Sequence, residues 1–307
     1  MPDATPPTAP VASPKIPAEK AGPSNLRQRI IYGLIGAVML LGSVWFSPWT
    51  FGLFFAIVQA IMLWEFYRMM RAGGYAPATW IGVIMGIIIF VVTCSTQALP
   101  WMRNEEMAVW GISVFGVVIF FLLVLPVILV IREMVVWPRF KQPFANIATV
   151  FGGLLYISFP MTMLVSLSLS KPNSYDPRRI FALLFLIWAS DIGAYAVGRT
   201  IGKHKLAPQI SPGKTWEGWA GGFGLTLVVG WAIGYVLPEL PLTHRLVAAG
   251  VVAVFAPLGD LAESMLKRSV GVKDSGSIMP GHGGLLDRFD AFLLVLPVLA
   301  LLQLLAG

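Results

Sequence analysis

The sequence predicts an all-α, polytopic integral membrane protein with about nine transmembrane helices. Hydrophobic residues make up 57% of the 307 residues and charged residues only 12%, about half the charged fraction of a typical soluble domain. So few charges could not cover the surface of a soluble protein of this size, and the apolar residues come in long runs that suit a bilayer. The single cysteine, Cys94, excludes a disulfide or a cysteine-rich metal site within one chain.

The first helices follow from an uncharged run. Residues 1–25 are rich in Pro and Ala without apolar periodicity, which predicts a disordered cytoplasmic tail. No charge then occurs from Ile30 to Trp64, a run too long for one span of about 20 residues. Ser47-Pro48 near its middle predicts a tight hairpin between two spans. Further spans are expected at about 80–99, 109–131, 146–169, 180–197, 219–237, 245–264 and 288–305.

Lys and Arg residues predict the orientation. With nine spans, the tail and the connections after the second, fourth, sixth and eighth spans share one side, with all but five of the 22 basic residues. The five on the other side are Arg103, Lys171, Arg178, Arg179 and Arg245. The rich side is expected to be cytoplasmic, in a multi-pass protein of the inner (plasma) membrane. The formal net charge of +7 therefore reflects topology and phosphate binding rather than nucleic acid.

Two connections on the predicted cytoplasmic side carry unusual polar residues. One extends from Asp191 to Glu217 and the other from Asp260 to Asp290. Asp191 interrupts one apolar run and Asp260 ends another, although a carboxylate in or near hydrocarbon is costly. Either could alone be a helix-end aspartate that reaches the interface. Together, beside Gly-rich polar loops, they are interpreted as site residues.

Helical spacing groups further acidic residues. Asp260, Glu263, Ser264 and Lys267 share one helix face, at i, i+3, i+4 and i+7. A lone Glu263–Lys267 ion pair is the structural alternative, but it leaves Asp260 unexplained. Asp287 and Asp290 likewise share a face at the start of the last helix. For Asp290 a purely structural helix cap stays open.

The residue types suit nucleotide chemistry. The hard oxygens of Asp260 and Asp287 suit Mg²⁺, which usually takes one or two carboxylates plus substrate phosphates. Basic side chains that can neutralise phosphates are Lys214, Lys267, Arg268, Lys273 and Arg288. Attraction to anionic lipid is the simpler alternative for these basic residues, but it does not account for the aspartates among them.

Glycines and a histidine complete the pattern. Gly281, Gly283 and Gly284 allow backbone N–H groups to approach phosphate closely. His282, set among them, fits a general base, a phosphate donor or a turn, and the choice stays open. Ser-Pro-Gly-Lys-Thr from Ser211 resembles part of a P-loop, but the full spacing and a preceding soluble strand are missing, so a P-loop NTPase is rejected.

At this point the sequence resembles the phosphatidate cytidylyltransferase family, the CDP-diacylglycerol synthases. The family signature is Ser-x-x-Lys-Arg, four residues, Lys-Asp, five residues, Pro-Gly-His-Gly-Gly, two residues and Asp-Arg-x-Asp. Every spacing is kept here from Ser264 to Asp290, with Met279 where Leu or Ile is commoner. The upstream elements Asp-x-Gly-Ala-Tyr and Ser-Pro-x-Lys-Thr-x-Glu-Gly also match, so the resemblance is detailed over about residues 188–290.

The resemblance implies a reaction of phospholipid biosynthesis. The cytidylyl group of CTP passes to phosphatidic acid, giving CDP-diacylglycerol and pyrophosphate with Mg²⁺ and a monovalent cation, K⁺. The family's metal-binding aspartates map onto Asp260 and Asp287, and a homodimer is typical. Residues 26–175 then form the N-terminal and middle helices, and residues 176–307 form a C-terminal catalytic transmembrane region.

The remaining site residues receive expected roles. The catalytic group comprises Lys214, Lys267, Arg268, Asp274, His282 and Arg288. The substrate-binding group comprises Asp191, Ser211, Thr215, Glu217, Lys273 and Asp290. One alternative is a related CTP-dependent enzyme acting on another lipid phosphate or lipid alcohol, such as a CDP-archaeol synthase or a polyprenol kinase. The other is a membrane transporter, although the inverted repeats that would support one are not visible.

Overall fold

The computed structural model describes residues 24–98, 114–171, 174–276, 278 and 283–305. Residues 1–23 of the predicted tail and His282 lie outside this part of the chain. Helices dominate the first half. They are α1 (Ser24–Phe46), α2 (Pro48–Ala72), α3 (Thr79–Ala98), α5 (Val114–Val136), α6 (Pro143–Gly153), the π-helical turn η2 (Leu154–Ser158) and α7 (Phe159–Leu167).

The second half adds four long helices and two short hairpins. The helical elements are α8 (Pro177–Ile201), α9 (Trp216–Ala232), the 3₁₀ turn η3 (Ile233–Tyr235), α10 (Leu242–Ser269) and α11 (Leu286–Leu305). Two antiparallel pairs join β1 (Leu169–Lys171) to β2 (Ser174–Tyr175) and β3 (Lys205–Ala207) to β4 (Ser211–Thr215). The sequence analysis did not predict these strands, because two to five residues are too few for an alternating pattern to show.

The predicted spans coincide with helices. The first two fall on α1 and α2, and the others fall on α3, α5, α6 with α7, α8, α9, α10 and α11, in that order. Five helical spans are long and apolar enough to cross a membrane, and Ile31–Phe46 and Thr79–Ser95 are shorter apolar helices. A helical membrane protein is therefore confirmed, whereas the count of about nine spans is not. The division near residue 175 stays a prediction.

The predicted hairpin at Ser47-Pro48 is confirmed. The Ser47 hydroxyl accepts a hydrogen bond from the Thr50 N–H at 3.2 Å, and the Thr50 hydroxyl accepts one from the Ser47 N–H at 3.1 Å. This reciprocal cap satisfies backbone groups at the start of α2, and Pro48 at the first helical position has no N–H to satisfy. The chain therefore turns back within a single residue between α1 and α2.

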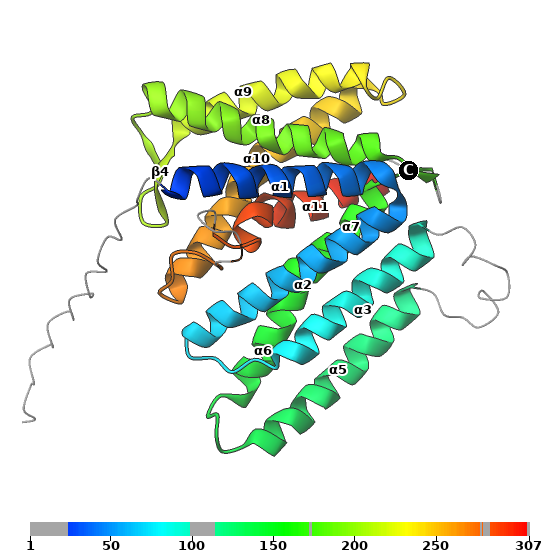
Figure 1. Cartoon of the computed structure of the whole chain (residues 1–307), viewed down its shortest axis with the longest axis vertical. Helices are drawn as coiled ribbons and strands as arrows, with labels where there is room; N and C mark the ends of the chain where they lie inside the picture. The colour runs from blue at the N-terminus through cyan, green and yellow to red at the C-terminus, as the bar shows by residue number, and fades with distance from the viewer. Residues whose placement is uncertain (1–23, 99–113, 172–173, 277, 279–282, 306–307) are drawn as a thin grey trace, which may run out of the picture.

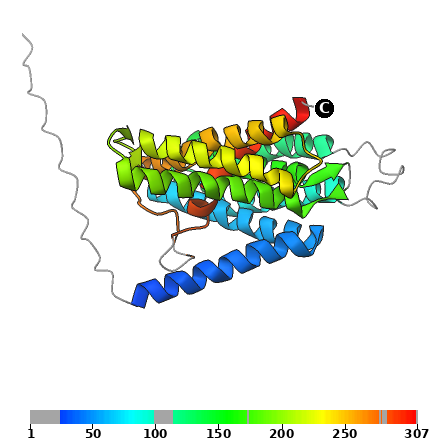
Figure 2. The same cartoon turned by 90° about the horizontal axis from the view of Figure 1, so that it is seen from above.

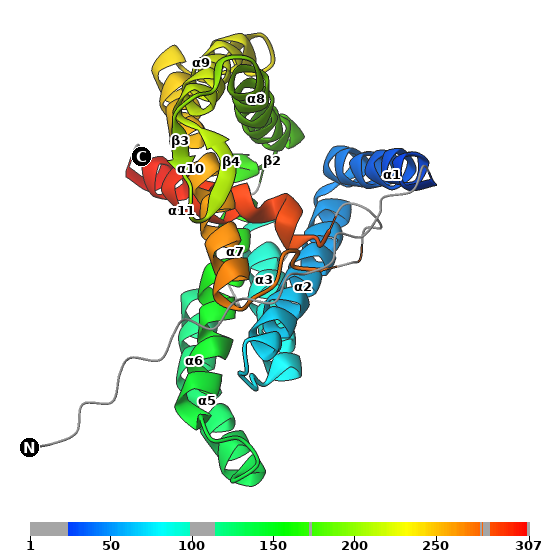
Figure 3. The same ribbon diagram turned by 90° about the vertical axis from the view of Figure 1, so that its left-hand side faces the viewer.

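The bundle has two groups of helices, and α11 and α7 lie between them. In Figure 1, α8, α9 and α10 pack together at one side, and α2, α3, α5 and α6 pack at the other. Between them, α11 contacts both α10 and α7. Figures 2 and 3 show α1 at the edge of the bundle, beside α2. The larger core cluster spans both groups and includes Phe55, Met62, Ile187 and Phe292.

Four connections gather at one end of the bundle. They join α2 to α3, α5 to α6, α8 to α9 through the β3–β4 hairpin, and α10 to α11 (Figure 1). These are the connections that the sequence assigns to one side of the membrane. The two predicted site connections therefore lie at the same end and can contribute to one site.

Small residues let α8 and α9 approach closely. A Cβ atom added at Gly222 would overlap the carbonyl oxygen of Ser190, and one added at Gly193 would overlap the carbonyl oxygen of Gly221. Close approach through small residues is typical of helix pairs in membranes, where dispersion forces replace the hydrophobic effect between helices. The glycines therefore fix the distance between the two helices that flank the β3–β4 hairpin.

We expect Gly222→Ala to lower the thermal unfolding temperature of the detergent-purified protein. The added methyl group forces α8 and α9 apart, and overpacking of this kind costs about 1–3 kcal/mol. Gly224→Ala is the matched control, because nothing lies within 4 Å of its added Cβ and alanine favours a helix over glycine. Equal unfolding temperatures for the two variants would contradict this account of the α8–α9 contact.

Candidate active site

A cleft of about 380 Å³ opens between α8, the β3–β4 hairpin with α9, and α10. Helix α8 contributes Asp191, Ala194, Tyr195, Gly198 and Arg199; the hairpin and α9 contribute Leu206, Gly213, Lys214, Thr215, Gly218 and Trp219; and α10 contributes Pro257 and Asp260. The cleft thus unites residues from both connections that the sequence singled out.

Pro257 shapes one wall of the cleft. A proline inside a helix has no N–H to offer the carbonyl four residues earlier, which here belongs to Ala253. The Trp219 indole N–H donates to that Ala253 carbonyl at 3.1 Å. Lys214 Nζ donates to the Pro257 carbonyl at 3.1 Å. The missing N–H therefore gives Trp219 of α9 a docking point on α10, and the Pro257 carbonyl oxygen helps to hold Lys214 of β4 at the cleft.

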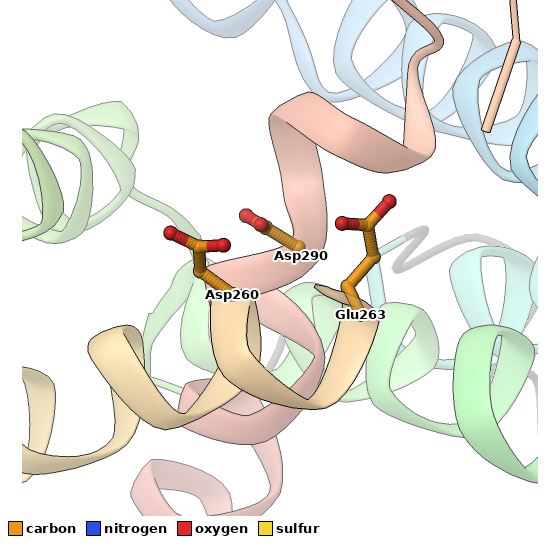
Figure 4. Close-up of side chains that lie close together, drawn as sticks. All are labelled: Asp260, Glu263 and Asp290. Atoms are coloured by element: carbon orange, nitrogen blue, oxygen red, sulfur yellow. The ribbon is translucent and has the colours of Figure 1, made fainter. Parts of the chain in front are cut away.

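Three carboxylates meet beside the cleft. One carboxylate oxygen from each of Asp260, Glu263 and Asp290 lies within 4.8 Å of the other two. Figure 4 shows Asp260 and Glu263 projecting from α10 and Asp290 projecting from α11. Asp191 of α8 lies close enough to interact electrostatically with Asp260 and with Asp290. We call Asp260, Glu263 and Asp290 the carboxylate group.

Two lysines partly neutralise these acids. Lys214 Nζ lies 2.7 Å from Asp260 Oδ2. Lys267 forms ion pairs with Glu263 and with Asp287, the latter at 2.6 Å. Glu263 is only 1% exposed, so its pairing with Lys267 is a buried one. The helix face predicted from Asp260 to Lys267 is therefore confirmed, and it also explains Ser264, whose hydroxyl contacts Asp260 Oδ1 at 3.3 Å.

Asp287 is held by a cradle of donors. Its Oδ1 accepts from Lys267, and its Oδ2 accepts from the N–H and hydroxyl of Ser275 at 3.1 and 3.0 Å and from the Gly284 N–H at 2.8 Å. Gly283 has a φ of 81°, which favours glycine. The Gly284 N–H, expected to face phosphate, thus points to Asp287. Metal binding by Asp287 stays a prediction, since the described acids gather around Asp260 without it.

Three predicted substrate-binding residues shape the β3–β4 hairpin. Thr215 caps α9, because its hydroxyl accepts from the Gly218 N–H at 3.1 Å. Glu217 accepts from the N–H of Lys203 and of His204 and contacts His204 Nδ1 at 2.6 Å. Ser211 begins β4, at the far end of that strand from Thr215. These contacts fix the hairpin that presents Lys214, and Thr215 also lines the cleft.

Other predicted residues lie further out. The side chains of Arg268, Lys273, Asp274 and Arg288 are exposed, and Arg268 donates to the Val272 carbonyl at 3.4 Å. They surround the connection between α10 and α11 but do not join the carboxylate group. Their roles stay predictions, and His282 lies outside the described residues.

Sequence reasoning missed Glu65 and Arg68 of α2. Glu65 accepts from the Leu286 N–H at 2.9 Å and contacts the Ser275 hydroxyl at 3.3 Å. Arg68 donates to the Ser275 carbonyl at 3.2 Å. A signal was present, because Glu65 immediately follows the uncharged run that ends at Trp64. Arg68 was counted only among the basic residues that predict topology, and Glu65 received no role, since local spacing says nothing of a contact with a distant segment.

The carboxylate group fits a divalent cation. Its donors are hard oxygens from two helices, and Mg²⁺ and Ca²⁺ prefer such ligands. Like charges this close also repel one another, and a bound cation relieves that repulsion. The residues present therefore suit Mg²⁺. Among the described residues no second acidic group is found that would hold another metal ion.

Comparisons with known proteins point to one family. A family model described as the cytidylyltransferase family matches residues 27–305. Phosphatidate cytidylyltransferase from Bacillus subtilis is 32% identical over 277 residues, covering 90% of this chain and 96% of the relative. The protein of that name from Haemophilus influenzae is 30% identical over 293 residues, covering 89% and 96%. The one from Staphylococcus saprophyticus is 50% identical over 124 residues, covering 40% and 47%.

We expect Lys267→Met to destabilise the protein strongly, because it leaves Glu263 and Asp287 as buried acids without their cation. Breaking a buried ion pair in this way costs about 3–5 kcal/mol. Adding Glu263→Gln to Lys267→Met should recover part of the loss. Thermal and chemical unfolding in detergent measure both effects. Lys273→Met, at an exposed position, is the control, and an equal loss there would show that the pairing of Lys267 is unimportant.

Proposed function

The chain belongs to the cytidylyltransferase family, and we infer from this membership that it transfers the cytidylyl group of CTP to phosphatidic acid. The products are CDP-diacylglycerol and pyrophosphate, so the protein is a nucleotidyltransferase of phospholipid biosynthesis. This inference is supported chiefly by the family model, which matches residues 27–305, and by two relatives that align with this chain over 96% of their own length. The cleft and carboxylate group supply the polar chemistry that such a transfer needs.

We propose that the protein crosses the inner membrane about nine times with its site facing the cytoplasm. Its apolar helices make it a membrane protein. The connections that carry the cleft share one end of the bundle, and the sequence concentrates Lys and Arg in those connections. CTP is a cytoplasmic solute, so this orientation gives the nucleotide direct access while the acyl chains stay in the bilayer.

The transfer is a substitution at phosphorus. A phosphatidate oxygen forms a bond to the α-phosphorus of CTP, and the bond from that phosphorus to the oxygen bridging the β-phosphate breaks, releasing pyrophosphate. The nucleophile is already an anion, so a strong general base is not essential. The main obstacle is repulsion between two polyanions, which is overcome by positioning and by positive charge.

Lysines of the site can provide that charge. Lys214 is held at the cleft by Pro257 and Asp260, and Lys267 lies between the carboxylate group and Asp287. A triphosphate entering the cleft would draw Lys214 away from Asp260, since both anions compete for it. Arg268, Lys273 and Arg288 are exposed in and beside the connection between α10 and α11, where they can attract phosphate groups.

Mg²⁺ is the proposed cofactor, held by Asp260 with Glu263 and Asp290, and with Asp287 as a further candidate ligand. When bound, it would supply Lewis-acid charge neutralisation on the triphosphate. The residues around it orient these acids through Lys214, Lys267 and Ser264. A K⁺ ion and a homodimer are proposed from the family resemblance alone.

Two alternative functions, a related enzyme acting on another lipid and a membrane transporter, are less well supported. The relatives are named for phosphatidate rather than for another lipid phosphate or a lipid alcohol. A transporter is disfavoured because the polar connections and the cleft are concentrated at one end of the bundle. A comparison of phosphatidic acid with a polyprenol and a polyprenyl phosphate as acceptors in one assay would separate the lipid alternatives.

We expect the purified protein to form CDP-diacylglycerol and pyrophosphate from CTP, phosphatidic acid and Mg²⁺. Asp260→Asn and Asp287→Asn should each lower kcat by about a hundredfold or more, because each removes negative charge from the predicted metal site. The kcat of Glu239→Gln should stay within about twofold of the wild-type value. Glu239 lies in the connection between α9 and α10, at the other end of the bundle, where it pairs with Arg178 of α8.

Two outcomes would contradict this proposal. Absence of product from a folded protein under varied metal and detergent conditions would reject the activity. Near-normal turnover by Asp287→Asn would remove Asp287 from the metal site while leaving the activity intact.

A further inference from the structure

Glu65 joins the N-terminal half of the bundle to the signature segment. Its carboxylate is buried in α2, with the residue 1% exposed. Oε2 accepts from the N–H of Leu286, which is 221 residues later, and contacts the hydroxyl of Ser275, which is 210 residues later. One carboxylate oxygen therefore touches both the connection between α10 and α11 and the first residue of α11.

Two glycines of the connection between α10 and α11 approach Glu65 closely. A Cβ atom added at Gly276 would overlap Glu65 Oε1, and one added at Gly284 would overlap Glu65 Oε2 and the Ser275 hydroxyl. Such close approach leaves no room for a side chain at either glycine. Gly276 and Gly284 are therefore fitted to this carboxylate, and the contact is more than a single hydrogen bond at the protein surface.

The same residues that contact Glu65 also hold Asp287. Ser275 donates to Asp287 through its N–H and lies within hydrogen-bond distance through its hydroxyl, and Gly284 donates through its N–H. Ser275 thus stands between two carboxylates. Arg68, one turn after Glu65 on α2, donates to the Ser275 carbonyl at 3.2 Å and fixes the residue from a second direction.

Glu65 also acts on the start of α11. Leu286 is the first residue of that helix, and a carboxylate near a helix N-terminus is favoured by the exposed N–H groups and the helix dipole. Asp287 and Asp290 lie within the next turn. The direction in which α11 begins, and with it the placement of both aspartates, therefore depends on an acceptor that α2 provides.

We propose that Glu65 is a positioning residue for the reaction, which holds Ser275 and Leu286 and, through Ser275, the carboxylate of Asp287. The role rests on the proposed function. A purely structural role would be met by any group that fills the space. In contrast, the positioning role requires an acceptor oxygen that receives the Leu286 N–H and contacts the Ser275 hydroxyl.

The first test compares Glu65→Ala with Gln59→Ala in the full-length protein in detergent. Gln59 is equally buried in α2, but it donates to the Gly86 carbonyl of α3, remote from the signature segment. We expect Glu65→Ala to lower kcat by about tenfold or more, because small displacements of positioned groups slow such transfers. We expect the kcat of Gln59→Ala to stay within about twofold of the wild-type value at the same folded fraction. An equal loss of kcat in both variants would overturn the proposal.

Hydrogen–deuterium exchange without substrate provides an independent readout. The amides of Ser275, Gly284 and Leu286 are hydrogen-bonded here. Peptides covering 274–286 should therefore exchange faster in Glu65→Ala than in the wild type, and at the wild-type rate in Gln59→Ala. Unchanged exchange in Glu65→Ala would overturn the role of Glu65. An inactive wild-type protein would instead overturn the proposed function, so the two failures are distinguishable.

A double-mutant cycle with Ser275→Ala tests whether Glu65 acts through Ser275. The two losses in kcat should not multiply, since either change breaks the same connection to Asp287. Fully multiplicative losses would overturn the proposal. If Glu65→Ala does not fold, Glu65→Gln takes its place, because glutamine keeps the volume but its neutral amide oxygen accepts more weakly from Leu286 and Ser275 than a carboxylate oxygen does. Its kcat should fall and should again be non-additive with Ser275→Ala, and normal kcat would overturn the proposal.

Discussion

Acidic side chains buried in this helical bundle need partners that offset their charge, and the rest of the site depends on that constraint. An unpaired buried charge is expensive in a medium without water. The acids of α10 and α11 are accordingly matched by Lys214, by Lys267 and by backbone N–H groups. The pairing leaves an excess of acid at the carboxylate group, and this excess is what makes the group suited to a cation.

Helix packing places the pairing partners. Glycines bring α8 and α9 together, so the β3–β4 hairpin between them is held over α10. Pro257 then leaves the Ala253 carbonyl without its helical donor, and Trp219 supplies one. Lys214 reaches Asp260 from this docked hairpin. The cleft is therefore a consequence of backbone hydrogen bonding, and its polar lining follows from which residues the hairpin and α10 bring to the same place.

Much of this could be predicted from the sequence, because the signals were local. Long apolar runs predicted the helices, Ser47-Pro48 predicted the first hairpin, and helical spacing put Asp260, Glu263 and Lys267 on one face. The predictions were limited where contacts are distant in sequence. Spacing could not show that Asp290 rather than Asp287 would meet Asp260, because that depends on how α11 is rotated against α10. Nor could it show that Glu65 would contact a segment more than 200 residues away.

Manganese binding tests the central claim most directly, which is that the carboxylate group holds the divalent cation. Mn²⁺ prefers similar oxygen ligands to Mg²⁺ and can be followed by electron paramagnetic resonance. The purified wild-type protein should bind Mn²⁺ saturably, and Asp290→Asn should weaken that binding by about tenfold or more while Glu239→Gln leaves it unchanged. Equal Mn²⁺ affinity in the wild type and in Asp290→Asn would contradict the account.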